Sequence, residues 1–175
     1  MGKPKETEMN ETDTRILVLS DSHGDILSLR KAVEAEQPAH ILHLGDHYAD
    51  AQELSRLYPH IPLHGVRGNT DDPLWGQAKQ SVWIGGFHLF LTHGHNYYVK
   101  TGLSFLTAHA RETRADAVLF GHTHRAFLEF DGIHIFNPGC VSGRLAGYGA
   151  ASYGVIELKN GVLTPAIKLL ADAGV

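Results

Sequence analysis

The fold is decided by a short stretch near the start of the chain, Ile16-Leu17-Val18-Leu19-Ser20-Asp21-Ser22-His23-Gly24. Its first four residues form a continuous apolar run, which is typical of a parallel strand that is buried on both faces. A helical pattern follows from Ile26 up to Pro38, with Asp25 in the position of an N-cap. A buried strand that ends in a polar turn and leads into a helix indicates a parallel sheet with helical crossovers.

The rest of the first half repeats this order. Residues 41–44 are expected to form a second buried strand, residues 49–57 a shorter helix and residues 63–66 a third strand. The second half instead favours hairpins, with turns at Gly85-Gly86, Asp131-Gly132 and Asn160-Gly161. It also contains a predicted helix over residues 103–114 and a strand over residues 117–120. The two halves together predict two sheets that pack face to face with helices outside them.

Length and composition limit the class of protein. A chain of 175 residues fits one domain, and we expect that domain over residues 14–175, after a disordered tail over residues 1–13. The net charge is -4 and the longest Lys/Arg run is a pair, so stable binding of nucleic acid is not expected. No apolar run is long enough for a membrane span and no leader opens the chain. We therefore expect a cytoplasmic protein without a membrane partner, and the sequence leaves open whether it forms a homo-oligomer.

Five polar clusters each follow a strand-like run. In order they are Asp21-Ser22-His23, Gly45-Asp46, Gly68-Asn69, His93-Gly94-His95 and Gly121-His122-Thr123-His124. Any one of these clusters alone is typical of an ordinary turn. Ligands of open α/β sheets bind beyond the carboxyl ends of the strands, so five such clusters can converge on one edge.

The side chains of these clusters are suited to metal ions. Seven of them offer imidazole, carboxylate or amide donors, which suit manganese, iron, nickel and zinc: Asp21, His23, Asp46, Asn69, His93, His122 and His124. Seven ligands are too many for one four- or six-coordinate ion with an open position. The count therefore predicts two divalent ions, bridged by Asp46 because a carboxylate has two oxygens.

A site with two metal ions indicates which kind of reaction the protein catalyses. Two metals roughly 3.5–4 Å apart can clamp the attacking and leaving oxygens of an in-line displacement, and a hydroxide between them is a nucleophile at neutral pH. We therefore expect hydrolysis of a small phosphate ester without an activated serine or cysteine.

The same clusters, in the same order, resemble those of the calcineurin-like metallophosphoesterases. The small size and the later Asn137-Pro138-Gly139 are most similar to the small YfcE-type bacterial and archaeal phosphodiesterases, and the resemblance covers residues 15–158. It implies an α/β fold built as a four-layer α/β/β/α sandwich, in which two packed mixed sheets are flanked by helices. It also implies a phosphodiesterase with two divalent ions, manganese being favoured over nickel, iron and zinc.

The resemblance further implies how the ligands are divided. One ion is expected on Asp21, His23, Asp46 and His124, and the other on Asp46, Asn69, His93 and His122. Asp46 and Asn69 are accordingly predicted to act in catalysis as well as in metal binding.

The sequence departs from the family at Thr70. Many members have a histidine there that protonates the leaving group, and the YfcE-type proteins usually have a cysteine. A threonine hydroxyl is too weak an acid for this step, which is worth about 10²–10⁴-fold in rate. We therefore expect either a preference for activated esters or another acid, for which His95 and His47 are the candidates, and we expect Asp71 to orient the Asn69 turn.

Other polar residues have simpler interpretations. Arg67 and Arg144 are candidates for holding a phosphate oxygen, although bracing a loop is the more frequent role of such arginines. The single cysteine, Cys140, is expected to be a buried thiol, and His43 a hydrogen-bonded core histidine. Residues 143–154 are glycine-rich and are expected to form a flexible loop.

Two alternative functions are kept. One is a non-catalytic scaffold of the same fold, as in a retromer subunit of eukaryotes, although such proteins have a degraded metal site and all seven ligands are present here. The other is a nucleotide hydrolase or phosphomonoesterase.

Overall fold

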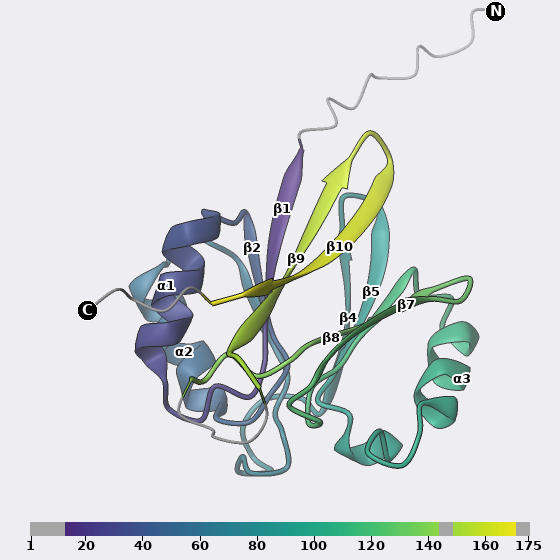
Figure 1. Ribbon diagram of the computed structural model, residues 1–175, viewed down its shortest axis with the longest axis horizontal. Coiled ribbons are helices and arrows are strands. Elements are labelled where there is room, and N and C mark those ends of the chain that lie inside the picture. Colours follow the sequence, from purple (N-terminus) through teal and green to yellow (C-terminus); the bar gives the residue numbers. More distant parts are fainter. Residues whose placement is uncertain (1–12, 144–148, 171–175) are drawn as a thin grey trace, which may run out of the picture.

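The computed structural model describes residues 13–143 and 149–170, which form two five-stranded sheets packed face to face with helices on their outer faces (Figure 1). The predicted four-layer α/β/β/α sandwich is confirmed. Of the predicted disordered tail only Asp13 falls within the described residues, so the tail and the single-domain boundary stay predictions. Arg144 and part of the predicted glycine-rich loop also lie outside the described residues.

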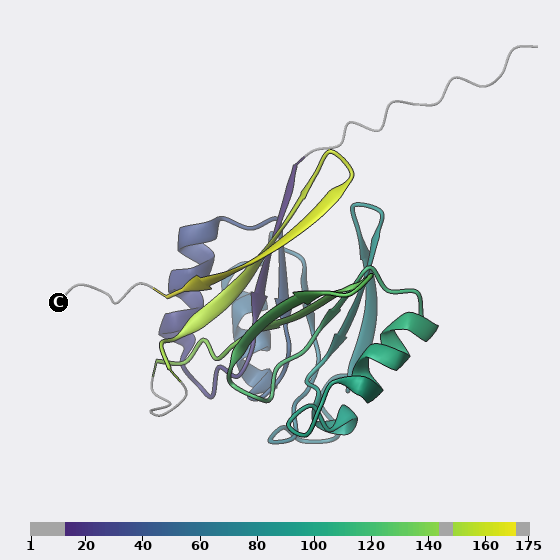
Figure 2. The ribbon, with the colours of Figure 1, turned by 45° about the vertical axis from the view of Figure 1, so that its right-hand side comes forward.

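The first sheet joins both ends of the chain. Its order is β10-β9-β1-β2-β3, and its strands are β1 (Thr14–Leu19), β2 (His40–His43), β3 (Leu63–Gly65), β9 (Ser152–Lys159) and β10 (Val162–Leu169). Strands β1, β2 and β3 are parallel, whereas β9 pairs antiparallel with β1 and with β10. The helices α1 (Ile26–Glu36) and α2 (Tyr48–Leu57) are the crossovers between the parallel strands and cover the outer face of this sheet (Figure 2).

The second sheet comes entirely from the middle of the chain. Its order is β4-β5-β6-β8-β7, and its strands are β4 (Lys79–Ile84), β5 (Phe87–Thr92), β6 (Ala117–Leu119), β7 (Ala126–Phe130) and β8 (His134–Pro138). The three central strands are parallel and the two outer ones are antiparallel to their neighbours. The helix α3 (Ser104–Glu112) covers its outer face, and a short 3₁₀ helix, η1 (His95–Tyr97), lies between β5 and α3.

The burial pattern of β1 explains why its residues 16–19 are apolar at every position. Ile16 and Val18 face the core between the two sheets, whereas Leu17 and Leu19 pack in the core beneath the helices. Because alternate residues of a strand point to opposite faces, a strand with cores on both sides has no polar position. A third core, which includes Phe90 and Leu106, lies between the second sheet and α3.

The predicted elements are present with shifted ends. Helix α1 ends at Glu36 because Gln37 takes a left-handed conformation before Pro38, and its predicted N-cap is formed by the Asp25 side chain, which accepts a hydrogen bond from the Ser28 amide. Residues 152–154, which were predicted as part of a flexible loop, instead begin β9. The helix η1 and the addition of the last hairpin to the first sheet were not predicted.

Glu36 fixes the last hairpin to the first helix. Its buried carboxylate accepts hydrogen bonds from the Tyr153 hydroxyl at 2.8 Å and from the Lys168 ammonium at 2.8 and 2.9 Å. Burial by itself raises the pKa of Glu36, but the hydrogen bonds from Lys168 and Tyr153 outweigh it and lower the pKa. This pair of contacts ties α1 to β9 and β10.

The two sheets approach closely where β9 crosses Phe136. A Cβ placed on Gly154 would lie 2.4 Å from Phe136 Cζ and 3.2 Å from Val18 Cβ. Phe136 is fully buried, so its ring cannot move aside without disturbing the core. Glycine at this position therefore sets the spacing of the two sheets.

Gly154→Ala should lower the free energy of unfolding by about 1–3 kcal/mol, since overpacking a tight core forces its neighbours to shift. Urea denaturation measures the loss. Gly65→Ala is the matched control in a strand, because its added Cβ would meet Tyr48 at an ordinary 3.4 Å. Equal losses in the two variants would contradict the close-approach account.

Candidate metal centre

The turns after β1, β2, β5 and β6 meet at one edge of the sandwich. Within the first sheet the Asp21 amide donates to the Gly45 carbonyl at 3.0 Å, and within the second the Gly121 amide donates to the His93 carbonyl at 3.0 Å. Two contacts join the sheets. His93 Nδ1 lies 2.7 Å from the Leu44 carbonyl, and the His122 amide donates to Asp21 Oδ2 at 3.2 Å. The carboxyl ends of parallel strands from both sheets therefore share one site.

Four of the predicted ligands form a compact group. Asp21, His23, Asp46 and His124 each offer one ligand atom, and these atoms all lie within 4.8 Å of one another. His124 Nε2 lies 3.1 Å from Asp21 Oδ1, and His23 Nε2 lies 3.7 Å from Asp46 Oδ2. These are the residues that the resemblance assigns to one ion.

His93 lies beside this group and touches both carboxylates. Its Nε2 is 3.3 Å from Asp46 Oδ1 and 3.9 Å from Asp21 Oδ1. Because Nδ1 faces the Leu44 carbonyl it carries the proton, and the lone pair of Nε2 is then directed to the centre, as in histidines that bind metals. Burial lowers the pKa of His93, but the adjacent Asp46 and Asp21 outweigh it and raise the pKa. For Asp46, burial raises the pKa of the carboxyl group, but His93 and the Thr70 amide outweigh it. The pKa of Asp46 therefore lies below its usual range.

The backbone holds these side chains in uncommon conformations. Five of the predicted ligands have positive φ angles: Asp21, His23, Asp46, His122 and His124, with values from 45° to 68°. Left-handed backbone at residues other than glycine costs free energy and is concentrated at functional sites. Neighbouring hydrogen bonds maintain it. Ser20 Oγ donates to Asp21 Oδ2 at 2.6 Å, which leaves Oδ1 directed at the centre.

The Gly68-Asn69 turn lies against Asp46. A Cβ on Gly68 would fall 2.0 Å from Asp46 Oδ1, so only glycine fits there. The Thr70 amide donates to the same oxygen at 3.2 Å. Asp71 accepts hydrogen bonds from the amides of Gly68 and Tyr48, both at 2.7 Å, and therefore braces this turn as expected.

Asn69 is placed less closely than the other predicted ligands. Its side chain is exposed, and within the described residues it has no hydrogen bond to the other ligands. The turn that carries it nevertheless contacts Asp46 through Thr70.

His122 and His95 stand on the other side of His93. The ring centroids of His93 and His122 are 5.0 Å apart, and the His95 ring lies 5.5 Å from His93 and 6.1 Å from His122. Burial above all, together with the neighbouring His93 and Lys100, lowers the pKa of His122 to about 4. Burial and the neighbouring His93 also lower the pKa of His95. Neutral imidazole is the form that binds a metal.

The donors at this centre fit divalent cations. Asp21 Oδ1, His23 Nε2 and His93 Nε2 are buried atoms without a hydrogen-bond partner among the described residues. Buried polar atoms are normally paired, because desolvating them without compensation is costly. Carboxylate oxygens and imidazole nitrogens that face one another can hold a cation between them, and this donor set suits borderline divalent metals.

The other histidine candidates differ in position. His43 is fully buried between the turns. Its Nδ1 accepts from the Gly45 amide at 3.3 Å, its Nε2 lies 3.0 Å from Ser22 Oγ, and burial lowers its pKa to about 4. It is the hydrogen-bonded core histidine that the sequence predicted. His47 is half exposed, and its Nδ1 lies 2.8 Å from Asp50 Oδ1.

Two further residues have structural roles. The Arg67 guanidinium donates to the Gly76 carbonyl at 2.9 Å and thus braces a loop. Cys140 is buried with its thiol 3.1 Å from the Asp21 carbonyl, and burial raises its pKa to about 12. A thiol with this pKa is not a nucleophile.

Sequence reasoning missed two supports of the centre. Ser20 orients Asp21, and Asn137 donates through Nδ2 to the Gly121 carbonyl and to Thr123 Oγ1, both at 3.0 Å, so that it holds the loop carrying His122 and His124. The position of Ser20 beside Asp21 gave no signal of its own. The Asn137-Pro138-Gly139 motif did mark Asn137, but its partners lie 14 and 16 residues away.

Known proteins share this sequence pattern. A probable metallophosphoesterase from Bacillus subtilis is 32% identical over 157 residues, which cover 85% of this chain and 87% of that protein. A phosphodiesterase from Methanocaldococcus jannaschii is 28% identical over 156 residues, with 76% and 87% covered.

Solved structures share the fold. A conserved protein from Streptococcus pneumoniae, described as a predicted phosphoesterase, superposes with a TM-score of 0.75 at 24% identity and 90% coverage of both chains. Vps29 from Entamoeba histolytica, complexed with zinc, gives a TM-score of 0.72 at 21% identity, with 91% of this chain and 94% of that one covered. At these identities the structures speak for the fold alone.

A family model decides the relationship. The calcineurin-like phosphoesterase superfamily domain matches residues 14–161, which is most of the chain. The predicted family is therefore confirmed, and this protein belongs to the calcineurin-like phosphoesterase superfamily.

Proposed function

We propose that this protein is a phosphodiesterase that hydrolyses a small phosphate ester with two divalent metal ions, manganese being favoured. The observation that carries the proposal is the group of facing donors formed by Asp21, His23, Asp46 and His124, whose ligand atoms all lie within 4.8 Å of one another. The name of the Methanocaldococcus jannaschii relative supports a diester as the substrate.

Two ions bound here would supply positive charge for the phosphoryl oxygens and would activate water as the nucleophile. Asp46 is suited to contact both ions, because its Oδ1 lies 3.3 Å from His93 Nε2 and its Oδ2 lies 3.7 Å from His23 Nε2. Asp21, His23, Asp46 and His124, whose ligand atoms form one group, would hold one ion. Asp46, Asn69, His93 and His122 are proposed to hold the other, as the family resemblance implies.

His95 is proposed as the proton donor to the leaving group. Its ring lies beside His93 and His122, and its Nδ1 is buried without a hydrogen-bond partner among the described residues. His47 is the weaker candidate, since its Nδ1 already contacts Asp50. Poor leaving groups would need a donor other than Thr70, because a threonine hydroxyl does not release a proton near neutral pH, whereas activated esters would not.

A non-catalytic scaffold remains the alternative from another class. The likeness to Vps29 concerns the fold, whereas a scaffold has no need of buried, unpaired donors. A nucleotide hydrolase or phosphomonoesterase would use the same centre and differs only in substrate. No helix among the described residues is long and apolar enough to cross a membrane.

The dependence of activity on metal ions tests whether this protein is a metal-dependent enzyme. Protein stripped of metal should not hydrolyse a bis-aryl phosphodiester, and activity should return when one of Mn²⁺, Ni²⁺, Zn²⁺ or Mg²⁺ is added back, with Mn²⁺ expected to be best. Release of the aryl alcohol measures the rate, and metal analysis gives the number of ions bound. A protein that binds two ions but hydrolyses no diester, monoester or nucleotide would favour the scaffold.

Asp46→Asn should reduce turnover by more than about 100-fold, because even the outer partners of metal ligands are worth about 10–100-fold. It should also lower the metal content, since the bridging charge contacts both ligand sets. Glu129→Gln is the matched control, because Glu129 is an exposed acid on β7 away from the centre. Full activity in Asp46→Asn would remove this residue from the metal centre.

His95→Ala should slow hydrolysis of alkyl diesters by about 10²-fold or more and of activated aryl diesters much less, because only poor leaving groups need a proton. The two rates are compared in the same metal-loaded preparations. An equal loss on both substrates would show that His95 does not act as the acid.

A further inference from the structure

A cavity of about 640 Å³ lies next to the metal centre and is not needed to hold metal ions. Its lining comes from the segment before α3, from the end of β6 and from the start of β7: Val99, Lys100, Leu103, Phe120, Thr123, Arg125, Ala126 and Phe127. Cavities that bind small molecules occupy roughly 300–1,000 Å³. The size therefore suits part of a small organic molecule.

The cavity is joined to the metal centre through Thr123. This residue stands between the predicted ligands His122 and His124, and its side chain lines the cavity. Asn137 holds its hydroxyl at 3.0 Å, so the loop keeps one position for both sites. A molecule held by the metals can therefore extend into the cavity.

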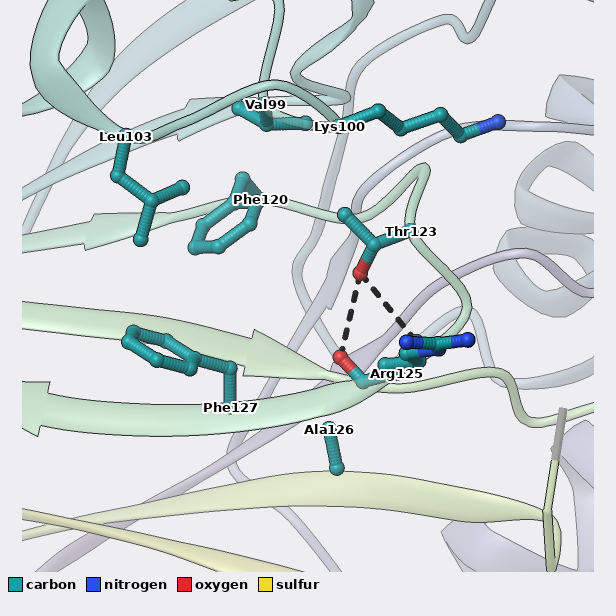
Figure 3. A pocket seen from close by; sticks show the side chains of 8 residues that line it. All are labelled: Val99, Lys100, Leu103, Phe120, Thr123, Arg125, Ala126 and Phe127. Atoms are coloured by element: carbon teal, nitrogen blue, oxygen red, sulfur yellow. Dashed lines mark hydrogen bonds between the residues drawn. The ribbon is translucent and has the colours of Figure 1, made fainter.

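The two ends of the cavity differ in chemistry (Figure 3). Leu103, Phe120 and Phe127 gather at one end, whereas Lys100, Thr123 and Arg125 lie at the other. Phe120 is 1% exposed and packs in the core under α3, so it provides a fixed apolar wall. The polar end contains Thr123 and is thus the end that adjoins the metal centre.

The two cations at the polar end have no fixed partner. Lys100 and Arg125 are both exposed, and within residues 13–143 and 149–170 neither forms an ion pair with an acidic side chain. The Arg125 backbone is held to Thr123 Oγ1 at 3.3 Å through both its amide and its carbonyl, which fixes the base of the guanidinium side chain. An exposed pair of cations beside an anion-binding centre is complementary to a second negative charge or to a phosphoryl oxygen.

We propose that this cavity binds the organic part of the ester, a flat apolar group such as an aromatic ring, while Lys100 and Arg125 contact an anionic oxygen attached to that group. This inference rests on the proposed function, because it names the class of ester that the metal centre would receive. The substrate is accordingly an aromatic phosphodiester and not a short alkyl one.

Binding without hydrolysis tests the cavity separately from the reaction. The probe is naphthalene-1-sulfonate, which joins an aromatic ring to an anion and contains no phosphate ester to be cleaved. Isothermal titration with the full-length protein compares this probe with sulfate, which is the anion alone, and with 1-naphthalenemethanol, which is the ring without the charge. The combined probe is expected to bind about tenfold more tightly than either part, since burying a ring and pairing its charge each add to affinity.

A variant that fills the cavity gives the sharpest test of the proposal. Leu103→Trp places a larger side chain in the cavity, because the Leu103 side chain is directed at Phe120 and Phe127 (Figure 3) and makes no cap hydrogen bond at the start of α3. It is expected to weaken binding of the probe by about tenfold or more. Val162→Trp, at an exposed position of β10 outside the cavity, should leave binding unchanged. Circular dichroism and the melting temperature confirm that both variants are folded.

Neutralising the cations gives a second, independent variant. Lys100→Gln and Arg125→Gln should each weaken probe binding by about threefold to tenfold at low salt, and the loss should shrink as salt rises. Lys79→Gln, an exposed cation of β4 outside the cavity, should have no effect. If the probe binds equally well to wild type, to Leu103→Trp and to the two Gln variants, the proposal is overturned.

Hydrolysis then separates this proposal from the proposed function. For a series of diesters with one common aryl leaving group, Leu103→Trp should raise KM about tenfold when the second group is aromatic and should change neither KM nor kcat when it is methyl. Cavity-dependent probe binding in a protein that cleaves no ester would support the cavity and refute the proposed function. Cleavage with the same KM values in wild type and Leu103→Trp would do the reverse.

Discussion

Two buried carboxylates set the main constraint on this structure. Asp21 and Asp46 are 0% and 3% exposed, and their ligand atoms lie within 4.8 Å of each other. Like charges at this separation repel strongly where water is excluded. Imidazole rings surround the pair, and His93 contacts both carboxylates. The arrangement is a site for positive charge, and the rest of the sandwich serves to hold it together.

The strain of the site is distributed over the turns. Left-handed backbone at five ligand positions persists because hydrogen bonds from Ser20, Thr70 and Asn137 fix the loops, and because Gly68 leaves room for the Asp46 carboxylate. The three packed cores hold the strands that carry these turns. The stability of the packed cores therefore offsets the backbone strain of the turns at the edge of the sheets, as is common at functional sites.

In the proposed function, the metal centre and the neighbouring cavity have different parts in recognition. The centre would bind the phosphoryl group, which all phosphate esters share, and the cavity would bind the organic group. The cavity has an apolar wall and two cations, and its loop is shared with His122 and His124 through Thr123. Because both are built on one loop, a change in that loop would alter catalysis and substrate choice together.

The sequence by itself determined the strand-helix order, the turns at which donors occur and the identity of those donors. These features are local: a buried strand is apolar at each position, an N-cap such as Asp25 is read within four residues, and the ligands follow strand ends directly. The family resemblance supplied the four-layer arrangement, and the structure confirmed it. The exposed position of Asn69 was not foreseen, because it depends on how the turn lies over Asp46 and not on the turn's own sequence.

Only the tertiary structure decided which distant segments meet. The final hairpin joins the first sheet beside β1. There Arg15 forms an ion pair with Glu157, which lies 142 residues away in the chain, and no local pattern encodes that pairing. The His122 amide that donates to Asp21 is likewise 101 residues away in the chain. Such contacts depend on the packing of whole sheets, in which one side chain meets partners from several elements, and periodicity along a single segment carries no record of them.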